Sequence, residues 1–374
     1  MEDTMSVNPI QIGPLSGKPG QLVYGQIPIL ELPSGTAEVW PVLIAQGPEP
    51  GPCLWLTANI HGDELTGVAA IHQVVTPKLA AALRGTIVAI PSLNPAGLRV
   101  EKRQPYYLDE DPNRLWPSGC PPEDDPDAKK PSALELAYAR LFQIVQDTAD
   151  FLLDLHNAGM RSIPFIFRDR VLYRKGEGGE ARIQAEALQA HVGELCAAFG
   201  LPVVVELPVK HWLGKKLHRS VSGAAVNLAR IPAVTVELGS WGVVTPDALE
   251  AATVGIHNVL VWAGMVDGEL RPNPAAPHAH QRGQFRRRRH PLAPASGLVR
   301  HLVRPGQPIE SGQPVAELRD IYGRPVGEGV IRTEYSGWVI SLQDGILAYP
   351  NRPIATLAIP DDQPLVDQYS EDVC

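Results

Sequence analysis

The sequence predicts an α/β fold, with a mixed and mostly parallel sheet flanked by helices, and a small all-β region at the C-terminus. Three observations lead to this prediction. Five apolar, β-rich runs alternate with helical patterns, the chain beyond residue 285 shows only short runs separated by Pro and Gly, and 374 residues with 44% hydrophobic content can build a full core. Strands that alternate with helices favour a largely parallel sheet. The length suits one large domain plus a smaller one, or two comparable ones.

The predicted strands are near-continuous apolar runs, which are typical of strands buried on both faces. They cover residues 52–60, 85–94, 150–157, 202–207 and 233–240. Between them, apolar residues recur at helical spacing over 64–75, 133–148, 180–200 and 245–264. Thr245 before Pro246 predicts a helix start, and Gly264 predicts its end.

The chain changes character at the Pro-rich segment 271–280. A boundary near 272–285 therefore divides a predicted α/β domain, residues 1–272, from a predicted β domain, residues 285–374. Residues 302–318 resemble half of a lipoyl or biotinyl carrier domain. No lysine follows Lys216, so covalent attachment of such a group is excluded. We expect this domain to be a structural cap or an oligomerisation surface, which leaves a homo-oligomer open.

The charge of the chain argues against a nucleic-acid partner. The formal net charge is −8, although four consecutive arginines stand at Arg286–Arg289. Because these arginines lie at the predicted domain junction of an acidic protein, we expect a solvated or carboxylate-paired strand. The basic segment 210–219 lines an entrance for anionic substrates in one interpretation and is a solvated loop in the other.

The remaining composition suggests a cytoplasmic protein without a membrane partner. No uncharged apolar run approaches the ~18 residues of a membrane helix, and the first residues lack the basic and apolar regions of a signal peptide. The four cysteines are scattered without a C-x-x-C pair, so neither a disulfide framework nor a thiolate zinc site is predicted. These are Cys53, Cys120, Cys196 and Cys374.

Polar side chains follow three predicted strands at the point where each strand ends. His61 and Glu64 follow the first, His156 closes another, and Glu237 ends a third. In open α/β sheets, ligands bind beyond the carboxyl ends of strands. Residues three apart in a turn or first helical turn share a face, so His61 and Glu64 can reach one ion together with His156. Two imidazoles and one carboxylate, with a fourth position left to water, form a catalytic zinc set.

Two neighbouring residues support this zinc site. Gly62 is small enough to keep the turn between His61 and Glu64 tight. Asp154 precedes His156 by two residues, on the same side of the predicted strand, and could orient that ligand from behind. A strand-end cap is the alternative interpretation of Asp154.

Taken together, the motifs resemble those of the succinylglutamate desuccinylase and aspartoacylase family, a branch of the zinc carboxypeptidase fold. The resemblance extends over about residues 50–265, with the motifs in the family's order, and the C-terminal segment resembles the β domain that family members append. The motifs are H-G-D-E at 61–64, N-P-A-G at 94–97, Arg103, N-R at 113–114, D-L-H-N at 154–157 and V-E-L-G at 236–239.

The resemblance implies a role for each matching residue. One Zn²⁺ per chain would be bound by His61, Glu64 and His156, and Glu237 would be the general base. Arg103 would polarise the scissile carbonyl, and Asn113 with Arg114 would bind the substrate's carboxylate. The family's acidic-Leu-Asn-Arg pattern appears here as D-P-N-R, after the lengthened segment Q-P-Y-Y-L-D-E-D-P. These departures leave the metal set intact and leave the acyl group undefined.

Simpler interpretations stay open for the last four of these residues. Glu237 could be a buried ion-pair partner, Arg103 an exposed loop charge, and Asn113 with Arg114 a turn and a surface charge.

For the whole protein, the first hypothesis is an amidohydrolase that removes a small acyl group from an N-acyl amino acid. The second is a carboxypeptidase that cleaves the C-terminal residue of a short peptide. The third, a catalytically silent binding protein, is disfavoured because the base Glu237 accompanies the ligands.

Overall fold

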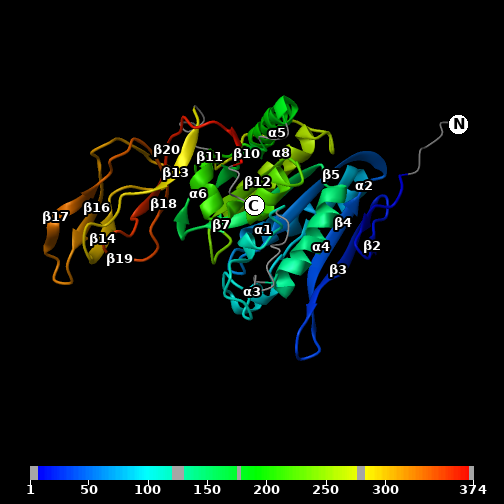
Figure 1. Cartoon of the computed structure of the whole chain (residues 1–374), viewed down its shortest axis with the longest axis horizontal. Helices are drawn as coiled ribbons and strands as arrows, with labels where there is room; N and C mark the ends of the chain where they lie inside the picture. The colour runs from blue at the N-terminus through cyan, green and yellow to red at the C-terminus, as the bar shows by residue number, and fades with distance from the viewer. Residues whose placement is uncertain (1–6, 120–129, 175–177, 276–282, 370–374) are drawn as a thin grey trace.

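The computed structural model describes residues 7–119, 130–174, 178–275 and 283–369. It confirms the predicted α/β fold, with a 13-stranded mixed sheet and helices packed on it (Figure 1). The sheet's central strands are parallel neighbours in the order β12, β7, β5 and β6, and they are buried along most of their length. Their bounds are β5 Glu49–Ala58, β6 Arg84–Ile90, β7 Phe151–Ala158 and β12 Ala233–Ser240.

The four long helices form where the apolar spacing predicts them. They are α1 (Thr66–Val74), α4 (Ala133–Thr148), α5 (Gly178–Phe199) and α8 (Pro246–Trp262). The Thr245 hydroxyl accepts from the backbone N–H of Ala248 and caps α8, and Gly264 takes a φ of 69° just beyond its end. Helix α8 packs against both α1 and α5, whereas α4 packs on the strand β3.

Several shorter elements complete this part of the chain. The antiparallel strands β3 (Gln21–Glu31) and β4 (Ala37–Gln46), which the sequence prediction missed, extend the sheet beyond β6. The other elements are β1 Gln11–Ile12, β2 Leu15–Ser16, α2 Pro77–Ala82, α3 Pro95–Val100, η1 Pro112–Arg114, β8 Arg161–Ser162, β9 Phe165–Arg168, β10 Val171–Tyr173, β11 Val203–Val205, α6 Val209–Gly214, η3 Leu217–Arg219 and α7 Val221–Asn227.

The C-terminal residues form strands, as predicted, and some of these strands continue the main sheet. Strand β13 (Phe285–Arg289) pairs in parallel with β11, and β20, β18 and β15 follow it in antiparallel order. Strands β17, β16, β14 and β19 form a separate antiparallel sheet at one end of the molecule (Figure 1). The bounds are β14 Gly297–His301, β15 Pro308–Ile309, β16 Pro314–Arg319, β17 Pro325–Arg332, β18 Gly337–Leu342, β19 Leu347–Ala348, β20 Ala355–Pro360 and β21 Val366–Gln368.

Two further contacts join the C-terminal region to the α/β part. Strand β21 pairs in parallel with β10, so Val366 lies opposite Val171. The Arg170 guanidinium contacts Asp361 at 2.7 Å, with both side chains almost fully buried. The predicted division at 272–285 stays a prediction, because residues 276–282 lie outside the described part and strands on either side of it pair with each other.

Within the described ranges, no helix is long and apolar enough to cross a membrane. Cys53 and Cys196 are buried free thiols, and burial raises the pKa of each to about 12. Both are therefore protonated at neutral pH, which is not the state in which a thiol binds zinc. Cys120 and Cys374 lie outside the described residues.

Candidate active site

The loop after β5 carries the first two candidate ligands, and Asn59 fixes its shape. Asn59 has a φ of 54°, a left-handed conformation that Asn adopts more readily than most residues. Its amide nitrogen donates to the backbone oxygens of His61 (3.0 Å) and Glu64 (2.9 Å), and its amide oxygen accepts from the Ser92 hydroxyl. Because one buried amide binds both backbone oxygens, the two ligand residues keep a fixed relative position.

Gly62 lies in this loop where the backbone of α3 approaches it. A Cβ atom on Gly62 would lie 2.1 Å from the carbonyl carbon of Gly97 and 2.4 Å from the nitrogen of Leu98. A larger residue would therefore push α3 away from the loop. The sequence suggests a tight turn as the reason for glycine here, and the structure adds close backbone packing as a second reason.

Three donor groups converge at the carboxyl ends of β5 and β7. His61 Nδ1 lies 2.7 Å from Glu64 Oε1, and His156 Nδ1 lies 2.8 Å from Glu64 Oε2. One ligand atom from each residue lies within 4.8 Å of the others, and all three side chains are buried. Two imidazoles and a carboxylate at this spacing could hold one metal ion.

Each imidazole has a second carboxylate partner on its far nitrogen. His156 Nε2 lies 2.7 Å from Asp154 Oδ2, and His61 Nε2 lies 3.2 Å from Asp111 Oδ1. A carboxylate on Nε2 holds the proton there and leaves the lone pair of Nδ1 for a metal ion. The surroundings of the donor set thus fit a divalent cation.

Asp111 is a functional candidate that the sequence prediction did not assign. Besides His61, its carboxylate accepts from the backbone N–H of Asn113 (2.9 Å) and from Arg103 Nη2 (2.7 Å). It therefore links a candidate ligand, the short helix η1 and a candidate catalytic arginine. The D-P-N-R motif contains this residue, so attention to its first position could have identified it.

Replacing Asp111 with Asn is expected to weaken zinc binding by about 10- to 100-fold, because the neutral amide no longer holds the proton on His61 Nε2 as firmly. Competition with a chromophoric chelator measures the affinity. Asp109→Asn is the matched control, since Asp109 is an exposed carboxylate of the same loop. Equal zinc affinity in the Asp111→Asn and Asp109→Asn proteins would remove Asp111 from this role.

The charges of the donor group shift each other's pKa. Burial would raise the pKa of Glu64, but His61 and His156 lower it well below its ordinary value. Burial would likewise lower the pKa of His156, but Asp154 and Glu64 raise it well above its ordinary value. Glu64 is therefore ionised at neutral pH, which is the form that binds a metal.

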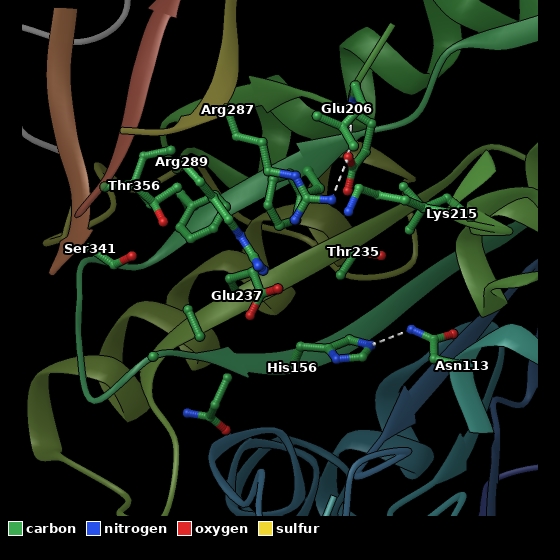
Figure 2. A pocket seen from close by; sticks show the side chains of 18 of the residues that line it. Asn113, His156, Glu206, Lys215, Thr235, Glu237, Arg287, Arg289, Ser341 and Thr356 are labelled. Carbon is green, nitrogen blue, oxygen red and sulfur yellow. Dashed lines mark hydrogen bonds and ion pairs between the residues drawn. The ribbon is translucent and has the colours of Figure 1, made fainter. Parts of the chain in front are cut away.

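Glu237 lies beside the donor group, on the neighbouring strand β12. The register of β12 with β7 places Glu237 opposite His156, and both side chains face the pocket (Figure 2). Burial raises the pKa of Glu237 to about 7, with Glu64 adding to the rise and His156 opposing it. Its Oε2 atom is buried and has no hydrogen-bond partner among the described residues. With a pKa near 7, Glu237 is partly ionised at neutral pH, and in the ionised form its unpaired oxygen is suited to accept a proton from a bound molecule.

Arg103 also reaches the donor group. Its Nη2 donates to Asp111 at 2.7 Å, and its Nη1 lies 3.6 Å from Glu64 Oε1. Its backbone oxygen accepts from the Asn94 side chain at 3.1 Å, which fixes the segment next to the loop of His61. Although its side chain is 42% exposed, Arg103 lines the pocket and is not a remote loop charge.

Asn113 and Arg114 line the same pocket, but they differ in how free their polar atoms are. The Asn113 amide oxygen accepts from the backbone N–H of Val221 (2.9 Å). Its nitrogen lies 3.4 Å from His156 Nε2, which cannot accept a hydrogen bond while it donates its own proton to Asp154. The amide oxygen of Asn113 is thus used inside the protein. Arg114 donates to the backbone oxygen of Asn113 and has no carboxylate within ion-pair distance among the described residues. Burial lowers the pKa of Arg114, while Asp111 opposes this effect.

The pocket has a volume of about 920 Å³ and continues past the donor group to the C-terminal strand β13. The four arginines of β13 were predicted to form a solvated or carboxylate-paired strand. In the structure Arg286 lies 3.6 Å from Asp361, and Arg287 lies 3.1 Å from Glu206. Arg288 and Arg289 have no such pair among the described residues, and all four arginines line the pocket. From the basic segment 210–219, His211, Lys215 and Leu217 also line it, so this segment is more than a solvated loop.

Comparisons with known proteins give the family of the chain. The family model described as the succinylglutamate desuccinylase/aspartoacylase catalytic domain matches residues 50–263. The N-alpha-acetyl-L-2,4-diaminobutyric acid deacetylase of Halomonas elongata is 27% identical over 317 residues, which cover 82% of this chain and 80% of the relative.

Solved structures of similar fold cover nearly the whole chain. A succinylglutamate desuccinylase/aspartoacylase from Rhodobacter sphaeroides has a TM-score of 0.70 at 19% identity and covers 96% of this chain and 99% of its own. The product-bound ectoine utilization protein EutE of Ruegeria pomeroyi has a TM-score of 0.69 at 20% identity, with coverages of 95% and 99%. At such identities the likeness shows the fold. The family match, by contrast, spans more than half of the sequence, and this chain therefore belongs to the succinylglutamate desuccinylase/aspartoacylase family of deacylases.

Proposed function

We propose that this protein is a zinc-dependent amidohydrolase that removes a small acyl group from an N-acyl amino acid. The observation that carries the proposal is the buried, unpaired Oε2 of Glu237 beside the convergent His61, Glu64 and His156 side chains. A hydrolase needs a carboxylate that is free to take a proton next to its metal. Membership of a family of deacylases supports the same reaction class.

His61 and His156 would hold the zinc ion through Nδ1, and Glu64 through its carboxylate. Asp111 and Asp154, on the far nitrogens, would keep both imidazoles oriented. When bound, zinc supplies Lewis acidity: it polarises the substrate carbonyl and lowers the pKa of water to about 7. The ligand set leaves a fourth position for water or substrate.

Glu237 would act as the general base and then as the general acid. Its unpaired oxygen would accept a proton from the attacking water and return it to the amide nitrogen as the C–N bond breaks. Arg103 would donate to the oxygen that gains negative charge during the attack. Loss of one well-placed donor of this kind typically costs about 3 kcal/mol of transition-state stabilisation.

Arg114 would bind the carboxylate of the amino acid, because its guanidinium lines the pocket and lacks a carboxylate partner among the described residues. A planar guanidinium matches a carboxylate with two parallel hydrogen bonds. Asn113 would support this contact mainly by holding η1 against the first turn of α7.

A carboxypeptidase would use the same metal set on a short peptide, and a catalytically silent protein would bind ligands without turnover. The deacylase is favoured over both because the H. elongata relative is a deacetylase of an acylated amino acid, and because the candidate base is present with the ligands. The substrate panel described next tests which acyl group and which amino acid the protein accepts.

Purified protein supplied with zinc is expected to contain about one zinc per chain, by elemental analysis, and to lose activity to a chelator. With N-acetyl, N-succinyl and N-formyl amino acids and with short peptides as substrates, we expect hydrolysis of at least one N-acyl amino acid to exceed that of every tripeptide. Faster cleavage of peptides would establish the carboxypeptidase instead. Binding without turnover of any substrate would establish the silent protein.

A further inference from the structure

A series of hydrogen bonds leads from a buried carboxylate to the wall of the pocket. Asp169, between β9 and β10, accepts from the Ser222 hydroxyl at 2.7 Å, and Ser222 Oγ lies 2.9 Å from Thr235 Oγ1. Asp169 and Ser222 are buried, whereas Thr235 is partly exposed and lines the pocket. Thr235 precedes Glu237 by two residues on β12, so both side chains leave the strand on the pocket side (Figure 2). We call Asp169, Ser222 and Thr235 the hydroxyl network.

Two donors fix the orientation of the hydrogen bonds at the Asp169 end. Trp212 Nε1, which can only donate, contacts Asp169 Oδ1 at 2.9 Å, and the Ser222 hydroxyl donates to Oδ2. Burial and the neighbouring Glu206 raise the pKa of Asp169 to about 7, whereas these two donors and Arg287 oppose the rise. Above that pH the carboxylate is ionised and has no proton to give, so Ser222 must be the donor.

The direction of the second hydrogen bond follows from the number of protons. A hydroxyl group has one proton and two lone pairs. Because the proton of Ser222 goes to Asp169, the 2.9 Å contact with Thr235 is a hydrogen bond only when Thr235 donates to Ser222. Thr235 then has no proton left for a ligand, and its hydroxyl has no further protein partner among the described residues. It therefore presents a lone pair to the pocket and acts there as an acceptor.

The hydroxyl network lies on the amino-acid side of the substrate in the proposed function. Val221, at the start of the helix that carries its middle residue, donates to the Asn113 amide oxygen at 2.9 Å. Thr235 is thus linked through α7 to η1, where Arg114 would bind the substrate's carboxylate. Along β12 it is linked to Glu237, which would protonate the amide nitrogen. Only the α-carbon of the amino acid separates these two substrate groups, so the group that reaches Thr235 belongs to the amino acid's side chain.

We propose that Thr235 is a specificity-determining residue, which accepts a hydrogen bond from a donor group on the side chain of the substrate's amino acid. The donor group is a hydroxyl, an amide N–H or an ammonium. Asp169 and Ser222 are positioning residues, which keep the lone pair of Thr235 directed into the pocket. The proposal rests on the proposed function and deepens it. A side chain that offers only an oxygen lone pair would face another lone pair at Thr235 and bind less well.

Two pairs of neutral, isomeric substrates test the proposal. Neutral groups are used because the arginines of β13 and the carboxylates Asp63 and Asp344 also line the pocket and would respond to charge. The first pair is N-acyl-L-homoserine, a donor, and N-acyl-O-methyl-L-serine, an acceptor only, and the second pair lengthens both side chains by one CH2 group. Each carries the acyl group that the substrate panel identifies.

The zinc-loaded wild-type protein is expected to prefer the hydroxyl compound by roughly 10- to 100-fold in kcat/KM in at least one pair. The assay is run at about pH 9, where Asp169 is ionised. Thr235→Val has nearly the same shape but no hydroxyl, so the ratio of kcat/KM between the isomers should fall to about one. Asp267→Asn is the control, because Asp267 is an exposed carboxylate outside the pocket, and it should leave the ratio unchanged.

Asp169→Asn is expected to reverse the preference. Since Trp212 Nε1 can only donate, the new amide oxygen faces Trp212 and the new amide nitrogen donates to Ser222. Ser222 then gives its proton to Thr235, and Thr235 donates into the pocket, which favours the ether. A purely structural role would slow both isomers equally. No preference in the wild-type protein, a preference that survives Thr235→Val, or one that Asp169→Asn leaves as in the wild type overturns the proposal.

Binding without turnover separates this proposal from the proposed function. Calorimetry with the Glu237→Gln protein measures the affinity for both isomers of each pair, with and without Asp169→Asn. A preference for the hydroxyl compound that Asp169→Asn reverses, together with no hydrolysis by the wild-type protein, would contradict only the deacylase. Hydrolysis with equal affinity for both isomers in both pairs would contradict only the role of Thr235.

Discussion

Replacement of Glu237 by Gln is expected to lower kcat for N-acyl amino acids by roughly 10²- to 10⁴-fold, with zinc content unchanged. Gln has nearly the same shape, but its amide cannot accept a proton from the attacking water at the buried position that Oε2 occupies. The side chain faces the donor group from β12 without belonging to the set that could hold the metal. Steady-state kinetics and elemental analysis on the same protein preparation measure both quantities.

Glu64→Gln provides the contrast for this experiment. Glu64 contacts both imidazoles, so its replacement should remove zinc and activity together. If Glu237→Gln also lost zinc in proportion to its activity, Glu237 would be a ligand and not a base.

Replacement of Arg170 by Ala is expected to lower the free energy of unfolding by about 3 kcal/mol. The buried carboxylate of Asp361 loses its shortest ion pair and keeps the 3.6 Å contact with Arg286 and the hydrogen bond from Gln284. Arg170 Nη2 lies 2.7 Å from Asp361, and its Nη1 donates to the backbone oxygen of Pro364 at 2.6 Å. Both side chains of the ion pair are almost fully buried, so water cannot replace the lost contact. Urea denaturation followed by fluorescence and circular dichroism measures the change.

A double-mutant cycle separates the ion pair from general damage to packing. Arg170→Ala combined with Asp361→Ala should cost less than the sum of the single changes, since the second change removes the buried carboxylate that Arg170 neutralises. Arg300→Ala serves as the exposed comparison and should cost less than about 1 kcal/mol. Strict additivity of Arg170→Ala and Asp361→Ala would show that the pair itself contributes nothing.

The sequence was sufficient to predict the central strands and long helices, since burial on both faces and helical spacing each leave a regular pattern. For α4, predicted at 133–148, the observed bounds agree to the residue, because Ser132 and Glu135 form a complete capping box at its start. The convergence of His61, Glu64 and His156 was also predictable, because each lies near or just after the end of a recognisable buried strand.

Other parts of the site depend on contacts that no local pattern records. Asp111 lies in an irregular segment 50 residues after His61, and only the folded chain brings the two together. Arg289 belongs to a run of four arginines that all line the pocket. Their position there depends on the pairing of β13 with β11 and β20, which joins segments far apart in the sequence. The sequence could therefore predict the candidate metal ligands, but not the residues around them that orient the ligands and line the pocket.

The parallel pairing of β10 with β21 has a consequence for synthesis of the chain. Val171 leaves the ribosome roughly 200 residues before its partner Val366, which at typical rates of translation means a delay of roughly 10–40 s. During that interval β10 has an open edge, and an open strand edge can pair with other chains. Premature termination near the C-terminus would make that exposure permanent, so truncated chains should aggregate even when every predicted zinc ligand is present.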